Sequence, residues 1–112
     1  MLAEDIRRVL AKREGFSEEQ DEEIKGCWEK EVKLLCKNEK DTARFLAKEC
    51  TEGEFVLLCE VLEEVAGRLM SKAVFEAIEK AGKRFSKVVE EEGLEEVLAY
   101  ALSYQEDIGD AW

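Results

Sequence analysis

The sequence of 112 residues contains no proline and no histidine, and it has no long hydrophobic run. The missing histidine removes the commonest general base of nucleophilic catalysis and a frequent zinc ligand. No stretch approaches the roughly 18 consecutive apolar residues that a membrane span needs. The first residues also lack the basic and then apolar order of a signal peptide. The sequence therefore predicts a non-enzymatic protein of the cytoplasm.

Positive charge is scarce as well, with 17 Lys and Arg against 28 Asp and Glu and a net charge of −11. A field of this sign repels phosphate backbones and anionic lipid headgroups. Direct binding to nucleic acid or to a membrane surface is therefore not expected. The same field accelerates the encounter with a basic protein, so the composition favours a protein partner of opposite charge.

The four cysteines form two pairs with the same spacing, Cys27 with Cys36 and Cys50 with Cys59. Nine helical steps place the two thiols of a pair on opposite sides of a helix, where they cannot chelate a metal locally. No glycine motif suggests a phosphate-binding loop. We predict no metal or cofactor site and interpret the thiols as small buried groups, with a redox, disulfide or metal role as the alternatives.

Apolar residues recur with a helical period along almost the whole chain, which predicts one α-helical domain over residues 1–112. We expect five to six short helices in a single bundle or a short α-solenoid-like array, with a flexible acidic tail at about residues 106–112. The expected helices span residues 2–12, 17–37, 40–49, 52–70, 72–84 and 87–105, the last broken at Gly93. Capping boxes at Ser17–Gln20 and Thr51–Glu54 should begin the second and fourth helices. The fourth is apolar around most of its circumference and should lie at the centre.

Many carboxylates have an ordinary explanation. Glu60, Glu63 and Glu64 lie on the predicted central helix, and Glu64 can pair with Arg68 four residues later. Such i,i+4 pairs are typical of a solvated helix face. The Glu-x-x-His motif of di-iron bundles is missing. We therefore assign no catalytic role to these carboxylates.

Two groups of carboxylates lack compensating positive charge nearby. The first acidic cluster consists of Glu18, Glu19, Asp21, Glu22 and Glu23, and the second acidic cluster consists of Glu90, Glu91, Glu92, Glu95 and Glu96. Carboxylates at a helix N-terminus are stabilised by its dipole, so a solubilising role also fits. A cationic partner would nevertheless recognise an uncompensated patch. Both clusters, with Trp112 as an aromatic anchor at the acidic chain end, are the predicted partner-binding residues.

One segment, over residues 41–80, carries a pattern of motifs. It contains Asp41–Leu46, a Cys-Thr-x-x-Glu-Phe capping box in Glu49–Phe55, a Glu-Val helix at Glu60–Val65 and a Ser-Lys helix start at Ser71. This pattern resembles small acidic α-helical immunity proteins of bacterial toxin–immunity loci, such as contact-dependent inhibition and polymorphic toxin systems. The resemblance implies a protein that binds a cognate toxin, for example a nuclease, and inhibits it by occlusion. It carries no catalytic residue over to this chain.

Two other functions stay open. A structural or adaptor helical module, able to form a homodimer, would need no basic partner. An enzyme would need carboxylates of raised pKa in a cleft, which a sequence does not display.

Overall fold

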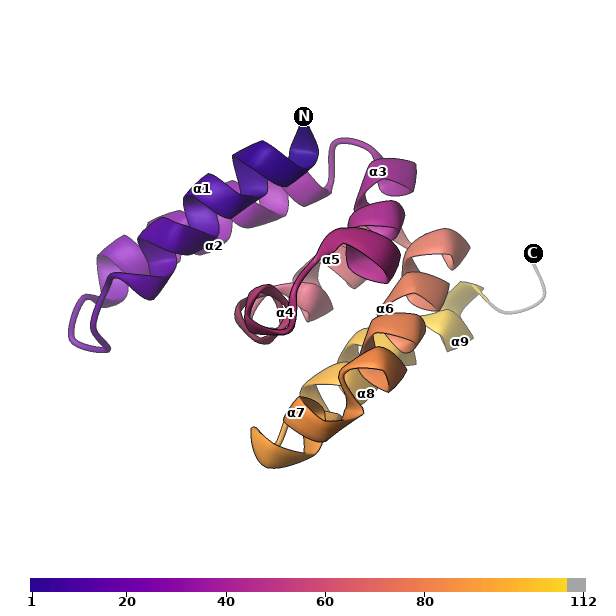
Figure 1. Ribbon diagram of the computed structural model, residues 1–112. Coiled ribbons are helices and arrows are strands. Elements are labelled where there is room, and N and C mark those ends of the chain that lie inside the picture. The colour runs from indigo at the N-terminus through magenta and orange to yellow at the C-terminus, as the bar shows by residue number, and fades with distance from the viewer. Residues whose placement is uncertain (109–112) are drawn as a thin grey trace.

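The computed structural model describes residues 1–108, with side chains up to Glu106, and these residues form helices and turns without a β-strand (Figure 1). The elements are α1 (Leu2–Glu14), α2 (Asp21–Leu35), α3 (Glu39–Arg44), the π-helical turn η1 (Phe45–Glu49), α4 (Glu52–Leu58), α5 (Leu62–Leu69), α6 (Lys72–Arg84), α7 (Ser86–Glu91), α8 (Glu95–Ser103) and α9 (Gln105–Ile108). The prediction of an all-α fold is confirmed over this part of the chain. The prediction of five to six helices is wrong, because the expected helices over residues 40–49, 52–70 and 87–105 are each divided and α9 follows the last of them.

The helices form a layered array in which elements three apart along the chain pack together. α1 contacts α4, α2 contacts α5, α3 contacts α6, α4 contacts α7 and α5 contacts α8. α1 and α2 also pack closely as an antiparallel hairpin, and this hairpin projects to the left in Figure 1. α4 contacts both α1 and α7, so it lies between the hairpin and the carboxyl-terminal helices.

The predicted central helix over residues 52–70 is wrong in its length. A turn over residues 59–61 divides it into α4 and α5, and Val61 leaves the helical conformation with φ −122° and ψ −1°. Phe55, Leu58 and Leu62 are fully buried on the two sides of this turn. A straight helix that is apolar around its circumference must be enclosed on every side, whereas a turn lets two shorter helices bury different faces. The central position of the segment is as expected.

The two predicted capping boxes have different outcomes. The Thr51 hydroxyl accepts a hydrogen bond from the Glu54 N–H at 3.2 Å, and the Glu54 carboxylate accepts one from the Thr51 N–H at 2.9 Å, which confirms the box that begins α4. The Ser17 box is only half formed: the Gln20 side-chain oxygen accepts a hydrogen bond from the Ser17 N–H at 3.0 Å, but the Ser17 hydroxyl accepts none from the Gln20 N–H. The Gln20 N–H donates to the Ser17 carbonyl at 3.0 Å, which closes a turn, and α2 begins only at Asp21.

The helical segment near the carboxyl terminus is interrupted at a glycine, which can adopt a positive φ angle. Gly93 has φ +64° and separates α7 from α8, as predicted. α8 ends at Ser103, and α9 occupies Gln105–Ile108, where the sequence predicted the tail to begin. The remainder of the predicted tail, with Trp112, lies outside the described residues.

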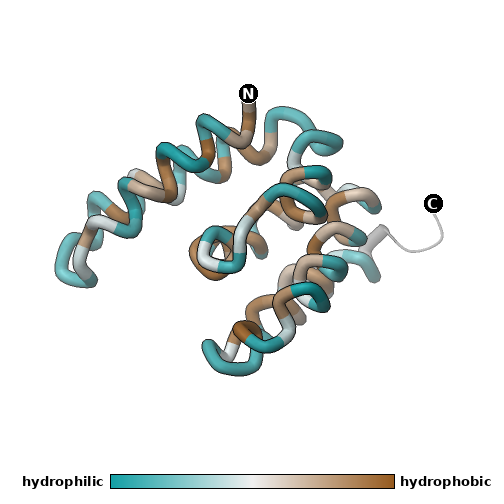
Figure 2. The backbone as a smooth tube through the Cα atoms, in the orientation of Figure 1, coloured by the Kyte–Doolittle hydropathy of each residue, from teal (hydrophilic) through white to brown (hydrophobic). Residues whose placement is uncertain are grey.

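Amphipathic helices supply one shared hydrophobic cluster. Its buried members come from α1, α2, η1 and α4 through α8, and from the turns beside α4, and include Ile6, Leu35, Phe55, Phe75 and Ala101. Figure 2 shows hydrophobic and hydrophilic residues alternating along the individual helices, as expected for elements with one buried face. Within residues 1–108, no helix combines the length and apolar character required to cross a membrane.

Candidate functional site: two acidic tips and a buried carboxyl group

The first acidic cluster lies at the tip of the α1–α2 hairpin. Glu18 and Glu19 occupy the connecting turn, and Asp21, Glu22 and Glu23 form the first turn of α2. All five residues are exposed. The helix dipole stabilises the three carboxylates inside α2, but Glu18 and Glu19 precede the helix by at least two residues. Part of this cluster therefore has no explanation in helix stability.

The second acidic cluster lies at the turn between α7 and α8. Glu90 and Glu91 end α7, Glu92 follows it, and Glu95 and Glu96 begin α8. All five are exposed. Carboxylates are favoured at the start of a helix and disfavoured at its end. The first three carboxylates of this cluster thus stand where helix electrostatics opposes them.

Neither cluster is neutralised by the ion pairs that residues 1–108 form. Those pairs are Arg7 with Glu54, Arg8 with Asp5, Arg13 with Glu60, Arg44 with Asp41 and Glu49, and Arg68 with Glu64. The arginines in these pairs bind carboxylates that lie outside both clusters. The two tips therefore present ten exposed carboxylates without a salt bridge in the described part of the chain.

The described residues do not test the prediction of an aromatic anchor at the chain end. Trp112 lies outside the described residues. Tyr104, the tyrosine nearest the chain end, is half-buried, and its ring covers Gly67 so closely that a Cβ atom added there would lie 3.0 Å from the ring. Tyr104 thus closes the contact between α5 and the end of α8 and is a packing residue.

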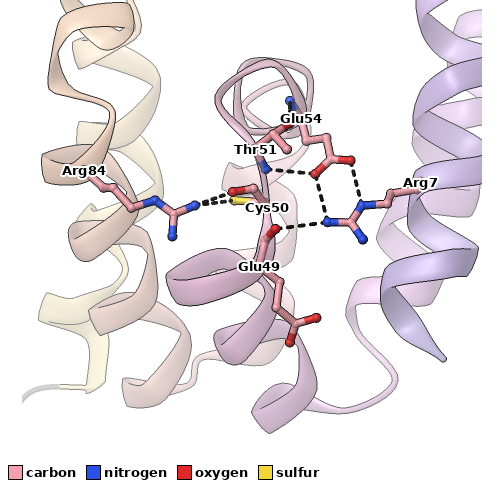
Figure 3. Close-up of polar contacts among 6 residues, drawn as sticks. All are labelled: Arg7, Glu49, Cys50, Thr51, Glu54 and Arg84. Carbon is pink, nitrogen blue, oxygen red and sulfur yellow. Dashed lines mark hydrogen bonds and ion pairs between the residues drawn. The ribbon is translucent and has the colours of Figure 1, made fainter.

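The segment that carries the family resemblance is held by two arginines (Figure 3). Arg7 of α1 donates from Nε to Glu54 Oε2 at 2.8 Å and from Nη2 to the Glu49 carbonyl at 3.0 Å. Burial by itself would raise the pKa of Glu54, but the hydrogen bonds from Arg7 and Thr51 outweigh it and lower that pKa. The capping box therefore also fastens α1 to α4.

Arg84 of α6 holds the same segment from the opposite side (Figure 3). Its Nη1 donates to the Ala47 carbonyl at 2.9 Å, and its Nη2 donates to the Cys50 carbonyl. The guanidinium also lies over the Phe85 ring, 4.3 Å from its centroid. Arg7 and Arg84 satisfy carbonyl groups that the irregular π turn leaves without helical partners. The residues around the Thr51 capping box thus have a structural role in this protein: they connect α4 to α1 and to α6.

Glu31 of α2 is the most unusual polar residue in the described structure. Its exposed fraction is 0%, and neither carboxylate oxygen has a hydrogen-bond partner. Burial and, to a smaller extent, the charge of Glu60 raise the pKa of Glu31 to about 7, against the opposing charge of Arg13. Glu31 is therefore a buried carboxyl group that can lose its proton near neutral pH.

Glu60 is the centre of the contacts beside Glu31. It accepts hydrogen bonds from Arg13 Nε at 2.9 Å, from Arg13 Nη2 at 2.7 Å and from Trp28 Nε1 at 3.0 Å. These bonds join α1 and α2 to the turn between α4 and α5. The sequence grouped Glu60 with Glu63 and Glu64 on the solvated face of one helix. Glu60 is exposed as expected, but it lies in the turn after α4 and contacts the hairpin instead of continuing the helix.

The cysteines are all free thiols. Cys27, Cys50 and Cys59 are buried, and burial raises the pKa of Cys59 to about 12. Cys36 is half-buried. Over residues 1–108, no three His, Cys, Asp or Glu side chains come together in a way that could hold a metal ion.

An open groove of about 400 Å³ runs between α6 and α8 beside the second acidic cluster. It is lined by Ile78, Glu79, Gly82, Lys83, Val89, Glu95, Leu98, Ala99 and Leu102. Most of its apolar lining belongs to residues already counted in the core, and Glu95 is the one member of the second acidic cluster in the lining.

Comparison with known proteins adds no assignment: no family model matches the chain, and no curated protein or solved structure is similar enough to count as a relative. The assessment of function therefore depends on the residues described above.

Sequence reasoning placed the exposed clusters and missed Glu31. A signal for it exists, because Glu31 lies seven residues after Ile24 and four before Leu35, on the apolar stripe of α2. A glutamate at such a position must either reach solvent past its neighbours or be buried. The structure places it in the interior.

Proposed function

We propose that this protein is an immunity-type inhibitor that binds a basic toxin domain through its two acidic tips. In this proposal it acts in the bacterial cytoplasm, by covering the toxin rather than by catalysis. The observation that carries the proposal is the pair of exposed clusters at hairpin turns, free of salt bridges in the described part of the chain and partly placed where helix electrostatics disfavours them.

Electrostatics supports a basic partner. A net charge of −11, with ten exposed carboxylates at the two tips, gives long-range attraction toward a cationic surface, and a toxin nuclease has such a surface where it binds its substrate. Complementary charge raises the association rate more than it raises the final affinity. An inhibitor that must capture its toxin quickly gains from this distribution.

The test is co-expression of this chain with the toxin domain encoded by the neighbouring reading frame. We expect growth to be restored and the purified pair to associate at a rate that falls steeply with ionic strength. Reversal of two charges in each tip, with Glu19→Lys, Glu22→Lys, Glu91→Lys and Glu95→Lys, should slow association by at least about tenfold at low salt.

The matched control reverses four exposed carboxylates outside both tips, Glu4, Glu29, Glu39 and Glu76, so that the net charge changes equally. The control variant should associate faster than the tip variant. Equal rates for the two variants, or an association rate indifferent to salt, would refute recognition through the tips.

The alternative is a non-enzymatic adaptor module that forms a homodimer. It is favoured by α8, which borders the open groove and carries Tyr100 with 54% of its surface exposed. Mass measurement in solution separates the two functions: a stable dimer that does not bind the neighbouring toxin domain favours the adaptor.

A further inference from the structure

The α1–α2 hairpin is attached to the rest of the protein at two positions of different chemistry. At one, Arg7 binds the Glu54 carboxylate and the Glu49 carbonyl. At the other, Arg13 and Trp28 bind Glu60, and the Glu31 carboxyl group lies nearby without a hydrogen bond. At the first contact the charges of Arg7 and Glu54 are paired. At the second, the buried Glu31 carboxyl group has no hydrogen-bond donor, so its neutral form is favoured over its charged form.

The charged groups around Glu31 come from each element that packs on α2. α1 supplies Arg13, and the turn between α4 and α5 supplies Glu60, and both charges act on Glu31. On α2 itself, Cys27 lies one helical turn earlier. α5 supplies Glu64 and Arg68, whose charges act on Cys36 farther along α2.

Ionised Glu31 would give this contact one positive charge, on Arg13, and two negative charges, on Glu31 and Glu60. Arg13 already makes a two-bond contact with Glu60, so it does not act as a hydrogen-bond donor to Glu31. A buried, unbonded carboxylate beside a second carboxylate is costly, and its simplest relief is contact with water. Separation of the hairpin from the α4–α5 turn would break the Arg13 and Trp28 contacts with Glu60 and would open this region to water.

We propose that the α1–α2 hairpin is a proton-controlled arm, docked on the α4–α5 turn while Glu31 is protonated and released from it when Glu31 ionises. Arg7 is its pivot, because the hydrogen bonds that lower the pKa of Glu54 keep that pair ionised across the neutral range. The arm carries the first acidic cluster at its tip, so release moves that cluster. This device goes beyond the proposed toxin inhibition and does not depend on it.

The size of the effect follows from proton linkage. Glu31 has an ordinary pKa of 4.5 in water and a pKa of about 7 in the docked arm. The ratio of docked to released arm should therefore fall by up to tenfold per pH unit, or by about 300-fold in total, as the pH rises between these values. The chain has no histidine, the side chain that ordinarily titrates in this range.

Trp28 fluorescence provides the test, because its indole N–H donates to Glu60 at the releasing contact. Trp112→Phe removes the only other tryptophan, and amino-terminal acetylation removes the α-amino group. We expect a fluorescence transition with a midpoint between pH 4.5 and about 7, the window in which the docked arm loses its advantage, with constant helical circular dichroism. Glu31→Gln should abolish the transition, whereas Glu29→Gln, an exposed change on the same helix, should leave it intact.

Two further variants keep the proposal testable if Glu31→Gln fails to fold. Arg13→Gln and Glu60→Gln each remove the two-bond contact that docks the arm, so each should shift the midpoint to lower pH than in wild type. A transition that persists in Glu31→Gln, a flat wild-type profile, or a loss of helix with the same midpoint would overturn the proposal. None of these outcomes involves a toxin, so they are independent of the proposed function.

Discussion

Glu54 and Glu31 both lie where the α1–α2 hairpin meets the rest of the protein, yet the structure treats them in opposite ways. Glu54 accepts hydrogen bonds from Arg7 and Thr51, and its pKa is lowered. Glu31 is buried without a donor, and its pKa is raised to about 7. Burial acts against the charge of both groups, so the difference lies in their hydrogen-bond partners. One end of the hairpin is consequently stable at neutral pH, and the other is sensitive to it.

The largest expected effect comes from replacing Glu31 by methionine. Below pH 4.5 Glu31 is protonated in both the folded and the unfolded chain; as the pH rises toward about 7 the unfolded chain releases the proton and the folded chain retains it. Wild-type stability therefore falls with rising pH over this window. Glu31→Met removes that loss, so its stability relative to wild type should improve by roughly 3 kcal/mol between pH 4.5 and pH 8.

Urea unfolding at the two pH values measures this difference, and the comparison cancels any constant effect of the new side chain on packing. Glu29→Met is the matched control, because Glu29 is exposed on the same helix. If the free energy of unfolding changed equally with pH in Glu31→Met and in wild type, Glu31 would have no raised pKa in the folded protein.

Glu54→Gln should have a smaller effect with the opposite pH dependence. The lowered pKa of Glu54 contributes stability above the unfolded value of about 4.5, and this contribution is lost as the pH falls through the folded pKa. We expect a loss of about 1–2 kcal/mol at pH 7, because the capping contact is weakened and the Arg7 side chain is 43% exposed to screening solvent. The loss should shrink toward pH 3.

Thermal unfolding over pH 3–7 tests this, with Glu52→Gln as the control in the same first turn of α4. If Glu54→Gln lost as much stability at pH 3 as at pH 7, the change would act through packing and not through the ion pair.

The smallest effect should come from Glu64→Gln on α5. Glu64 and Arg68 form an i,i+4 pair at 3.7 Å with side chains 54% and 62% exposed. Such pairs contribute about 0.3 kcal/mol, and salt removes that contribution. Denaturant unfolding of both proteins with and without about 0.5 M salt, which shortens the Debye length to roughly 5 Å or less, should show a difference in stability only at low salt. A loss of more than about 1 kcal/mol in the free energy of unfolding would contradict this, because it would mean that the Glu64–Arg68 pair stabilises the protein as strongly as the Glu54 contacts do.

Local sequence signals predicted the elements whose ends are decided by neighbouring residues. The Thr51 capping box, the Ser71 cap of α6 and the Gly93 break all occur as expected, because each depends on hydrogen bonds or backbone angles within a few residues. The exposure of both acidic clusters also follows from composition, since so many carboxylates cannot be buried. Their function remains a prediction.

The sequence by itself determined that this chain is helical, where most helices begin, and that its excess negative charge gathers at two hairpin turns, because periodicity, caps and charge act locally. Only the tertiary structure decided that the central segment turns at residues 59–61, that Glu60 meets Arg13 and Trp28, and that Glu31 is enclosed. These contacts join residues about 30 to 47 positions apart. The pKa of a buried group depends on such distant partners, so the contrast between Glu54 and Glu31 arises in the folded protein.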